Sequence, residues 1–226
     1  MSSDKDLPED LWDILSPRLT EERRVRMTEV AAARTRHLCL VMQDIYHPHN
    51  ISACLRSAEA FGVQDIHVVD SSESFKAGKT ARGVTDWLNI ETHTSPKACA
   101  EALNQRGYVI LAGIPAQDAI PLHQLPVEQP MALLFGNEHA GISPEWGPWI
   151  QRYFTIPMQG MVQSLNISVS AAICLHSLSR SASMKIKPEQ YTLSKAEQNQ
   201  LLGQWLSRQI PSWKGEYHFR KSRTDI

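Results

Sequence analysis

The stretch IPMQGMVQSLNISVSAAICLHSL, residues 156–178, begins as strand-like sequence and continues as helix-like sequence. Residues 156–161 are typical of a strand end followed by a tight turn. From Ser164 onward, apolar residues recur on every side of the predicted helix, and a helix without a polar face is expected to be buried. Its first turn nevertheless contains three hydrogen-bonding side chains, those of Gln163, Ser164 and Asn166.

Two of these side chains need different explanations. Ser164 can cap the helix, because a serine oxygen accepts hydrogen bonds from the free N–H groups of a first turn. Asn166 lies inside that turn, where a buried amide without partners costs roughly 1–3 kcal/mol. We therefore expect the Asn166 side chain either to bond to another segment or to face a ligand pocket.

Short apolar runs on the N-terminal side of this stretch are predicted to be strands. They occupy residues 37–45, 65–70, 88–94, 108–114, 131–137 and 153–158. Strands of this length that alternate with helices indicate an α/β domain with a parallel sheet.

The intervening segments show helix start and stop signals. A helix is predicted over 51–61, another from Ser95-Pro96 to about Gly107, and a short one opens at Pro144. Flanking helices are predicted over 20–36, with Thr20 as the N-cap, and over 194–210.

The composition describes an ordinary globular protein. The chain has 226 residues, of which 42% are hydrophobic and 21% are charged, enough for one sizeable core. No apolar run approaches the roughly 18 residues of a membrane span, and the acidic N-terminal segment does not resemble a signal peptide. Four scattered cysteines without a CxxC motif are expected to be reduced core residues of a cytoplasmic protein. They are Cys39, Cys54, Cys99 and Cys174.

The charge distribution divides the chain into three parts. Residues 37–183, the predicted core domain, contain 8 Lys/Arg and 12 Asp/Glu, whereas the C-terminal tail, residues 184–226, contains 8 and 4. The N-terminal helical extension, residues 1–36, has six arginines and three glutamates within 18–36. Such flanks can bind the phosphates of a nucleic acid, although solvated helix faces would give the same pattern.

Two further polar motifs follow predicted strands, at the edge where parallel sheets bind ligands. In NISACLR, Asn50 stands at the strand-to-helix junction and Arg56 follows six residues later. Alone, these would be a helix cap and a surface arginine. In GNEHAGI, Gly136 and Gly141 flank Glu138 directly after an apolar strand, where glycine allows close backbone approach or positive φ. The loop lacks the GxGxxG pattern of a dinucleotide site.

Two histidines near the first motif raise the question of a metal. His47 and His49 are close together, but no further ligand residues cluster near them in the sequence. Protein metal sites usually gather three or four ligands. The sequence therefore predicts no metal ion.

The three motifs together, in this order and spacing, resemble those of the SpoU branch of the SPOUT RNA methyltransferases. The resemblance covers about residues 20–184 and is greatest to the type that methylates the ribose 2′-hydroxyl of the D-loop guanosine 18 in tRNA. It implies an α/β domain with a deep trefoil knot in its C-terminal half, S-adenosyl-methionine as methyl donor, and a homodimer formed through the knot region. Nothing in the periodicity of the sequence predicts a knot.

The resemblance also implies roles for individual residues. The backbone would hold S-adenosyl-methionine around Gly113, Gly136, Ile156 and Leu165. Arg56 would clamp the reacting hydroxyl and a neighbouring phosphate, because a guanidinium is not expected to give up its proton and act as a base. The remaining site residues would order the substrate, and the final proton acceptor stays open. They are Asn50, Glu138, Ser164 and Asn166.

The expected RNA contacts come mainly from the flanks. They are Arg23, Arg24, Arg26, Arg82, Arg180 and Arg220. The family type often carries two arginines after its long helix, but Ala182 stands near the second position, and the loop 71–87 is also unusual. The exact target is therefore open between tRNA guanosine 18, a ribosomal RNA nucleotide and a wobble nucleotide. A catalytically inactive RNA-binding protein is the remaining alternative, and the presence of Arg56, Glu138 and Asn166 argues against it.

The predicted long helix has more apolar surface than one covered face requires, which agrees with burial in a dimer contact. One side is formed by Leu165, Val169, Ala172 and Ile173. The other side is formed by Ile167, Ala171, Cys174, Leu175 and Leu178.

Overall fold

The computed structural model describes residues 7–45, 47–72, 75 and 83–224. These residues form two compact units by their contacts, Thr35–Tyr191 and the combination of Met1–Arg34 with Thr192–Ile226.

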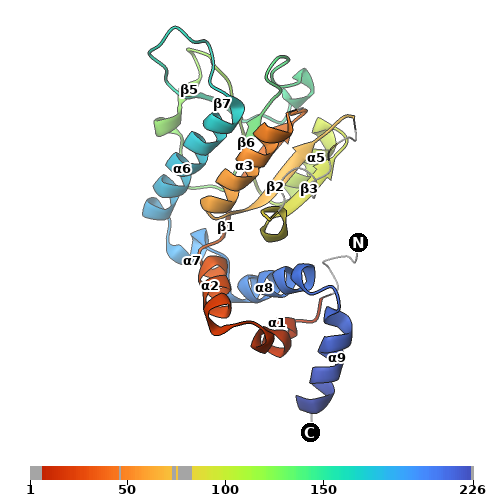
Figure 1. Cartoon of the computed structure of the whole chain (residues 1–226). Coiled ribbons are helices and arrows are strands. Elements are labelled where there is room, and N and C mark those ends of the chain that lie inside the picture. Colours follow the sequence, from red (N-terminus) through yellow and green to blue (C-terminus); the bar gives the residue numbers. More distant parts are fainter. Residues whose placement is uncertain (1–6, 46, 73–74, 76–82, 225–226) are drawn as a thin grey trace. The chain divides into compact units, whose positions relative to one another are not determined.

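A seven-stranded sheet lies at the centre of the unit Thr35–Tyr191 (Figure 1). Its strand order is β3-β2-β1-β6-β4-β7-β5, and every pairing is parallel. The strands are β1 (Thr35–Gln43), β2 (Val63–Val69), β3 (Asn89–His93), β4 (Val109–Gly113), β5 (Ile120–Pro121), β6 (Met131–Phe135) and β7 (Arg152–Thr155). The predicted α/β class and all six predicted strands are confirmed. Sequence reasoning missed β5, which has only two residues.

Helices cover both faces of this sheet, which explains why its central strands are continuous apolar runs. One face packs against α3 (Pro48–Ala60) and α6 (Ile167–Lys185), and the other against α5 (Pro96–Gln105) and η5 (Pro144–Trp146). Shorter elements complete the unit. They are η3 (Thr85–Trp87), η4 (Leu122–Gln124) and α7 (Pro188–Tyr191).

Helix boundaries follow the expected capping chemistry with two exceptions. Ser95 caps α5 by accepting a 3.2 Å hydrogen bond from the Ala98 N–H, as predicted. However, α3 begins at Pro48, so Asn50 lies within its first turn rather than at the junction. The second exception is α6, which begins at Ile167 instead of Ser164.

Asn166, and not Ser164, caps α6. Its Oδ1 accepts hydrogen bonds of 2.9 Å from the Ser168 N–H and 2.6 Å from the Ser168 hydroxyl. The Asn166 side chain, expected to need partners inside a buried turn, therefore finds them as the helix cap.

The expectation that α6 is buried on all sides is wrong for the single chain. The predicted second side is buried throughout. On the first side, however, Val169 and Ile173 are 47% and 38% exposed.

The unit of Met1–Arg34 and Thr192–Ile226 is helical. Its elements are α1 (Leu11–Leu15), η2 (Ser16–Arg18), α2 (Glu21–Ala32), α8 (Lys195–Gln209) and α9 (Trp213–Thr224). Within it, α8 packs against α1 and α2, and α1 also contacts α9. Thr20 caps α2 and Ser194 forms a capping box on α8, so both predicted flanking helices are confirmed. The division of the chain at 36/37 and 183/184 stays a prediction.

Two global expectations can be checked directly. All four cysteines are free and buried, as predicted. Within the described ranges, no helix combines the length and the apolar character needed to cross a membrane.

Candidate active site

A cavity of about 440 Å³ lies at the carboxyl ends of β4, β6 and β7. Parallel strands end at the same edge of a sheet, so segments distant in the sequence meet there. The four positions expected to hold a cofactor, which are Gly113, Gly136, Ile156 and Leu165, all line this cavity.

Much of the remaining wall is apolar. Its apolar residues include Pro115, Phe135, Ile142, Phe154 and Met158. Such a wall suits a ligand with an apolar or aromatic body that a few polar groups orient. Sequence reasoning missed these residues because the signal that unites them is the strand order, which local periodicity does not contain.

Gly136 is required by the fold of its own loop. A Cβ at this position would lie 2.2 Å from the carbonyl oxygen of Gly141, a distance that no side chain tolerates. Gly141 has φ +70°, in the left-handed region that favours glycine. The two glycines therefore close the loop that contains Glu138.

The polar residues of the three motifs meet beside the cavity. The Asn50 Nδ2 donates a 2.5 Å hydrogen bond to Oε1 of Glu138. In turn, the Asn166 Nδ2 donates a 3.2 Å bond to Oδ1 of Asn50. Glu138 and Asn166 line the cavity itself, as does Ser164. The structure thus joins Glu138, Asn50 and Asn166 in one hydrogen-bonded row.

Arg56 lies outside this row. It is exposed on α3, nearly two turns beyond Asn50, and is not among the residues that line the cavity. Within the described part of the chain it forms no hydrogen bond or ion pair. Its guanidinium is available to a ligand that approaches from solvent.

The predicted RNA contacts are spread over both units of the chain. Arg180 is exposed on α6, about 20 Å along the helix from Ile167 by the helical rise of 1.5 Å per residue. Arg82 lies outside the described residues. The other four, Arg23, Arg24, Arg26 and Arg220, belong to the helical unit.

The arginines of α2 have partners within the chain. Arg23 donates to Gln209 over 2.6 Å, and Arg24 and Arg26 form ion pairs with Glu21 and Glu29. Such exposed pairs contribute only about 0–1 kcal/mol, so a phosphate can replace them.

Arg34, counted above with the basic segment 18–36, cannot bind RNA in this conformation. It is fully buried, and its guanidinium lies 5.5 Å from the centre of the Trp205 ring.

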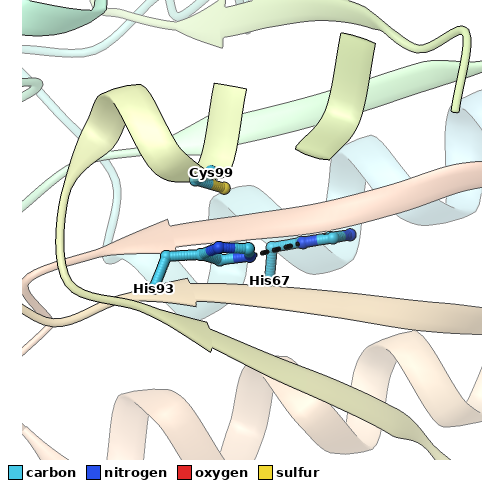
Figure 2. Close-up of side chains that lie close together, drawn as sticks. All are labelled: His67, His93 and Cys99. Atoms are coloured by element: carbon cyan, nitrogen blue, oxygen red, sulfur yellow. Dashed lines mark hydrogen bonds between the residues drawn. The ribbon is translucent and has the colours of Figure 1, made fainter. Parts of the chain in front are cut away.

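A second polar group is buried between the sheet and α5 (Figure 2). The parallel register pairs Val69 of β2 with His93 of β3, which places His67 and His93 on the same face. The His67 Nδ1 lies 3.0 Å from the His93 Nε2, and Cys99 of α5 is close to both. The ligand atoms of these three residues lie within 4.8 Å of one another, as transition-metal ligands do.

The contacts of His67 with His93 and Arg106 are accounted for by hydrogen bonds, without a bound metal ion. Arg106 Nη1 lies 3.2 Å from His67 Nε2 and can only donate, so His67 accepts there and carries its proton on Nδ1, toward His93. A metal bound to Nδ1 would move that proton to Nε2, against the Arg106 donor.

Burial also favours the neutral forms of these residues. It lowers the pKa of His67 to about 4 and lowers that of His93, and it raises the pKa of the Cys99 thiol to about 12. The expectation of no metal stays a prediction, which elemental analysis of protein purified without metal-affinity resin would test. The exposed His47 and His49 belong to no such group among the described residues.

Comparison with known proteins identifies the family. Residues 37–176 match the model of the SpoU rRNA Methylase family. The chain belongs to the SpoU methylase family. This match spans all three motifs, and the predicted resemblance is confirmed.

Similar SpoU methylases include several enzymes of one activity. The tRNA (guanosine(18)-2′-O)-methyltransferase of Escherichia coli strain K12 is 34% identical over 184 residues, which cover 80% of each chain. The enzyme of the same name from Thermus thermophilus is 35% identical over 162 residues, covering 71% of this chain and 84% of the relative.

Solved structures of SpoU proteins share the fold. The A. aeolicus TrmH/SpoU tRNA modifying enzyme is 28% identical with a TM-score of 0.74, covering 84% of this chain and 98% of that one. The methyltransferase AviRb from Streptomyces viridochromogenes, in complex with the cofactor AdoMet, has a TM-score of 0.57 at 27% identity. That match covers 68% of this chain and 60% of AviRb.

Proposed function

We propose that this SpoU methylase transfers the methyl group of S-adenosyl-methionine to the 2′-hydroxyl of guanosine 18 in the D-loop of tRNA. The observation that carries the proposal is the row of Glu138, Asn50 and Asn166 beside the 440 Å³ cavity. The relatives named for this activity match most of the chain, which supports this target over a ribosomal or wobble nucleotide.

The cavity fits S-adenosyl-methionine. Its apolar wall suits the adenine and the methylene groups, and the backbone at Gly113, Gly136, Ile156 and Leu165 would bind the polar atoms. When bound, S-adenosyl-methionine supplies a methyl group activated by its sulfonium sulfur. The protein then has to position the ribose and supply charged groups that stabilise the reacting hydroxyl.

Positioning of the ribose falls to the polar side chains. A hydroxyl must attack the methyl carbon in line with the bond that breaks, so it has to be held at a fixed angle. Arg56 would bind the hydroxyl or its neighbouring phosphate from the solvent side through its fixed fork of donors. The hydrogen bond to Glu138 fixes the Asn50 amide, and Asn166 fixes its oxygen side. The group that finally accepts the proton stays open.

The helical unit would contribute tRNA affinity. The predicted N-terminal extension and C-terminal tail meet in this unit, whose exposed α2 arginines are held only by weak surface pairs. We infer that residues 37–183 act as the catalytic domain and that the flanks bind phosphates. A tRNA substrate is in keeping with a cytoplasmic location.

We also infer a knotted C-terminal half and a homodimer formed through it. Large apolar side chains are exposed on the loop before α6 and on its first turns, and contiguous surfaces of this kind mark contact sites. They are Met161, Val162, Val169 and Ile173.

One experiment tests the proposed activity. The purified chain is incubated with S-adenosyl-methionine and an unmodified tRNA transcript, and the methylated nucleotide is mapped. We expect one 2′-O-methyl group, at guanosine 18, and none on a transcript with 2′-deoxyguanosine there. Methylation of another nucleotide would refute guanosine 18 as the target. Absence of methyl transfer to any tRNA or ribosomal RNA would refute the proposed methyltransferase activity.

A further inference from the structure

The loop that contains Glu138 is fastened to the carboxyl end of β1 at two points. At its start, the Asn137 Nδ2 donates a 2.8 Å hydrogen bond to the carbonyl oxygen of Asp44. At its end, the Gln43 Oε1 accepts two hydrogen bonds, 3.0 Å from the Ser143 N–H and 3.1 Å from the Trp146 indole N–H. Gln43 and Asn137 are both buried, so these bonds are shielded from water.

Asn137 also fixes the conformation of the loop itself. Its Oδ1 accepts from the N–H groups of His139 and Ala140, over 2.8 and 2.9 Å. Its own N–H and C=O form two 2.9 Å bonds with Gly141. The residues on both sides of Glu138 are thereby held, which limits the positions that the Glu138 carboxylate can take.

Asp44, which directly follows β1, is itself held by several hydrogen bonds. Asp44 has φ +49°, the one positive value for a non-glycine residue in the described chain. Its carboxylate accepts from the Ser71 N–H and hydroxyl and from the Gln43 Nε2, over 3.1, 2.9 and 3.2 Å. These bonds hold Asp44 in its unusual conformation, in which its carbonyl accepts from Asn137.

We propose that Gln43 and Asn137 are positioning residues, which set the Glu138 carboxylate against the Asn50 amide and so determine the rate of methyl transfer. The inference rests on the proposed function. The sheet topology supports this role. Asn50 follows β1 and Glu138 follows the neighbouring strand β6, and the hydrogen bonds of Gln43 and Asn137 connect the ends of these two strands. Gln43 does not line the cavity, so it acts through the loop and not on the ligand. Asn137 does line the cavity, but its side chain is bonded to Asp44, His139 and Ala140.

A matched pair of variants tests the role of Gln43. Gln43→Met removes the acceptor of two donors and the donor to the Asp44 carboxylate while nearly conserving volume. Gln64→Met makes the same change at a fully buried amide of β2, which donates to the Trp87 carbonyl and does not line the cavity. We expect Gln43→Met to lower kcat at saturating tRNA and cofactor about tenfold or more, since small displacements of catalytic groups cost this much. The KM for tRNA and the Kd for S-adenosyl-homocysteine should change less than about threefold, and Gln64→Met should keep kcat within about twofold.

If Gln43→Met does not fold, a second variant tests whether the bonds of the Glu138 loop affect the rate of methyl transfer. Asn137→Asp keeps an acceptor for His139 and Ala140, replaces the donor to Asp44 by an acceptor, and introduces a carboxylate. It should lower kcat in the same way, and it should also lower the melting temperature, because the buried carboxylate faces the Asp44 carbonyl without a donor. A thermal melt shows whether the variant is folded at the assay temperature. An unchanged kcat in the folded variants, or an equal loss in Gln64→Met, would overturn the inference. Wild-type protein assayed in parallel separates this result from failure of the proposed function, in which the wild type itself would be inactive on tRNA.

Discussion

Asn50 and Glu138 are 88 residues apart in the chain, yet the Asn50 amide donates a 2.5 Å hydrogen bond to the Glu138 carboxylate. The contact exists because each residue follows one of two adjacent parallel strands, β1 and β6. It joins the first two motifs directly, and Asn166 adds the third. Predictions about the chemistry of the site start from this contact.

Asn50→Asp should make the reaction acid-dependent. The change places a second carboxylate next to Glu138, and the repulsion between two carboxylates at this distance disfavours the doubly ionised pair. We expect the rate at pH 8 to fall more than about tenfold and to recover in part at lower pH, when one of the pair binds a proton. A pH profile of kcat measures this effect, and a profile parallel to that of the wild type would contradict it.

Arg56→Ala should abolish methyl transfer while cofactor binding stays nearly intact. Arg56 is exposed on α3 and does not line the cavity, so its loss leaves the cavity wall unchanged. Calorimetry with S-adenosyl-methionine and a single-turnover assay give the two readouts. Arg152→Ala, at an exposed arginine at the start of β7, is the matched control and should keep activity. Loss of cofactor affinity in the Arg56 variant would refute the assignment.

Basic residues of the helical unit should supply much of the affinity for tRNA. Replacing Arg23, Arg24 and Arg26 by glutamine removes three charges, of which two form weak surface ion pairs and one donates to Gln209. We expect weaker binding and a smaller salt dependence, because fewer counterions are released from the phosphates. Removal of the chain from Arg220 onward should act in the same direction.

Filter binding across a salt series measures this contribution. Activity at saturating tRNA should largely return in both variants, since the residues position the substrate and take no part in the chemistry. If affinity and salt slope stayed the same in both, tRNA recognition would have to come from another part of the chain.

Ile173→Asp should convert a dimer into a monomer. The side chain is 38% exposed on the early part of α6, and a charge there would be buried without a partner in the proposed contact. Met184→Asp, at a 74% exposed position in the last turn of the same helix, should leave the dimer intact. Sedimentation velocity at micromolar concentration distinguishes the two, and a fully active wild-type monomer would disprove the assembly.

Stability at mildly acidic pH should depend on His67. Burial lowers its pKa to about 4 in the folded chain, against about 6.5 when unfolded, so the unfolded state binds the proton more readily. Stability is therefore lost as the pH falls from about 6.5 toward 4, by up to about 3 kcal/mol.

His67→Gln removes this titration and should flatten the dependence of the unfolding free energy on pH in that window. Urea denaturation at several pH values provides the measurement. His139→Gln, at an exposed histidine, serves as the control and should follow the wild type. An equally steep loss of stability in the His67 variant would rule out the buried histidine as the cause.

The local elements could be predicted because their signals are local. Apolar runs marked six of the strands, and Ser95 and Thr20 marked helix starts through capping chemistry. The start of α6 was placed too early because both Ser164 and Asn166 are good caps, and only the three-dimensional contacts select Asn166. The segment of α9, with Gly215 near its start and few apolar residues, gave no helical signal.

The polar residues of the candidate site could be picked out from the sequence, but the residues that hold them in place could not. Asn50, Glu138 and Asn166 stood out through motif spacing. Gln43 and Asn137 looked like ordinary polar residues at strand ends, because their importance comes from bonds to residues about 100 positions away. No periodicity or local pattern encodes such partners.

The close approach of Gly141 to Gly136 has a consequence for engineering. A ligand bulkier than the natural one would require a wider cavity. Position 136 is closed to such redesign, because any side chain there meets backbone that cannot move without opening the loop of Glu138. Met158 and Pro115 line the same cavity, so a library that enlarges it should begin with them.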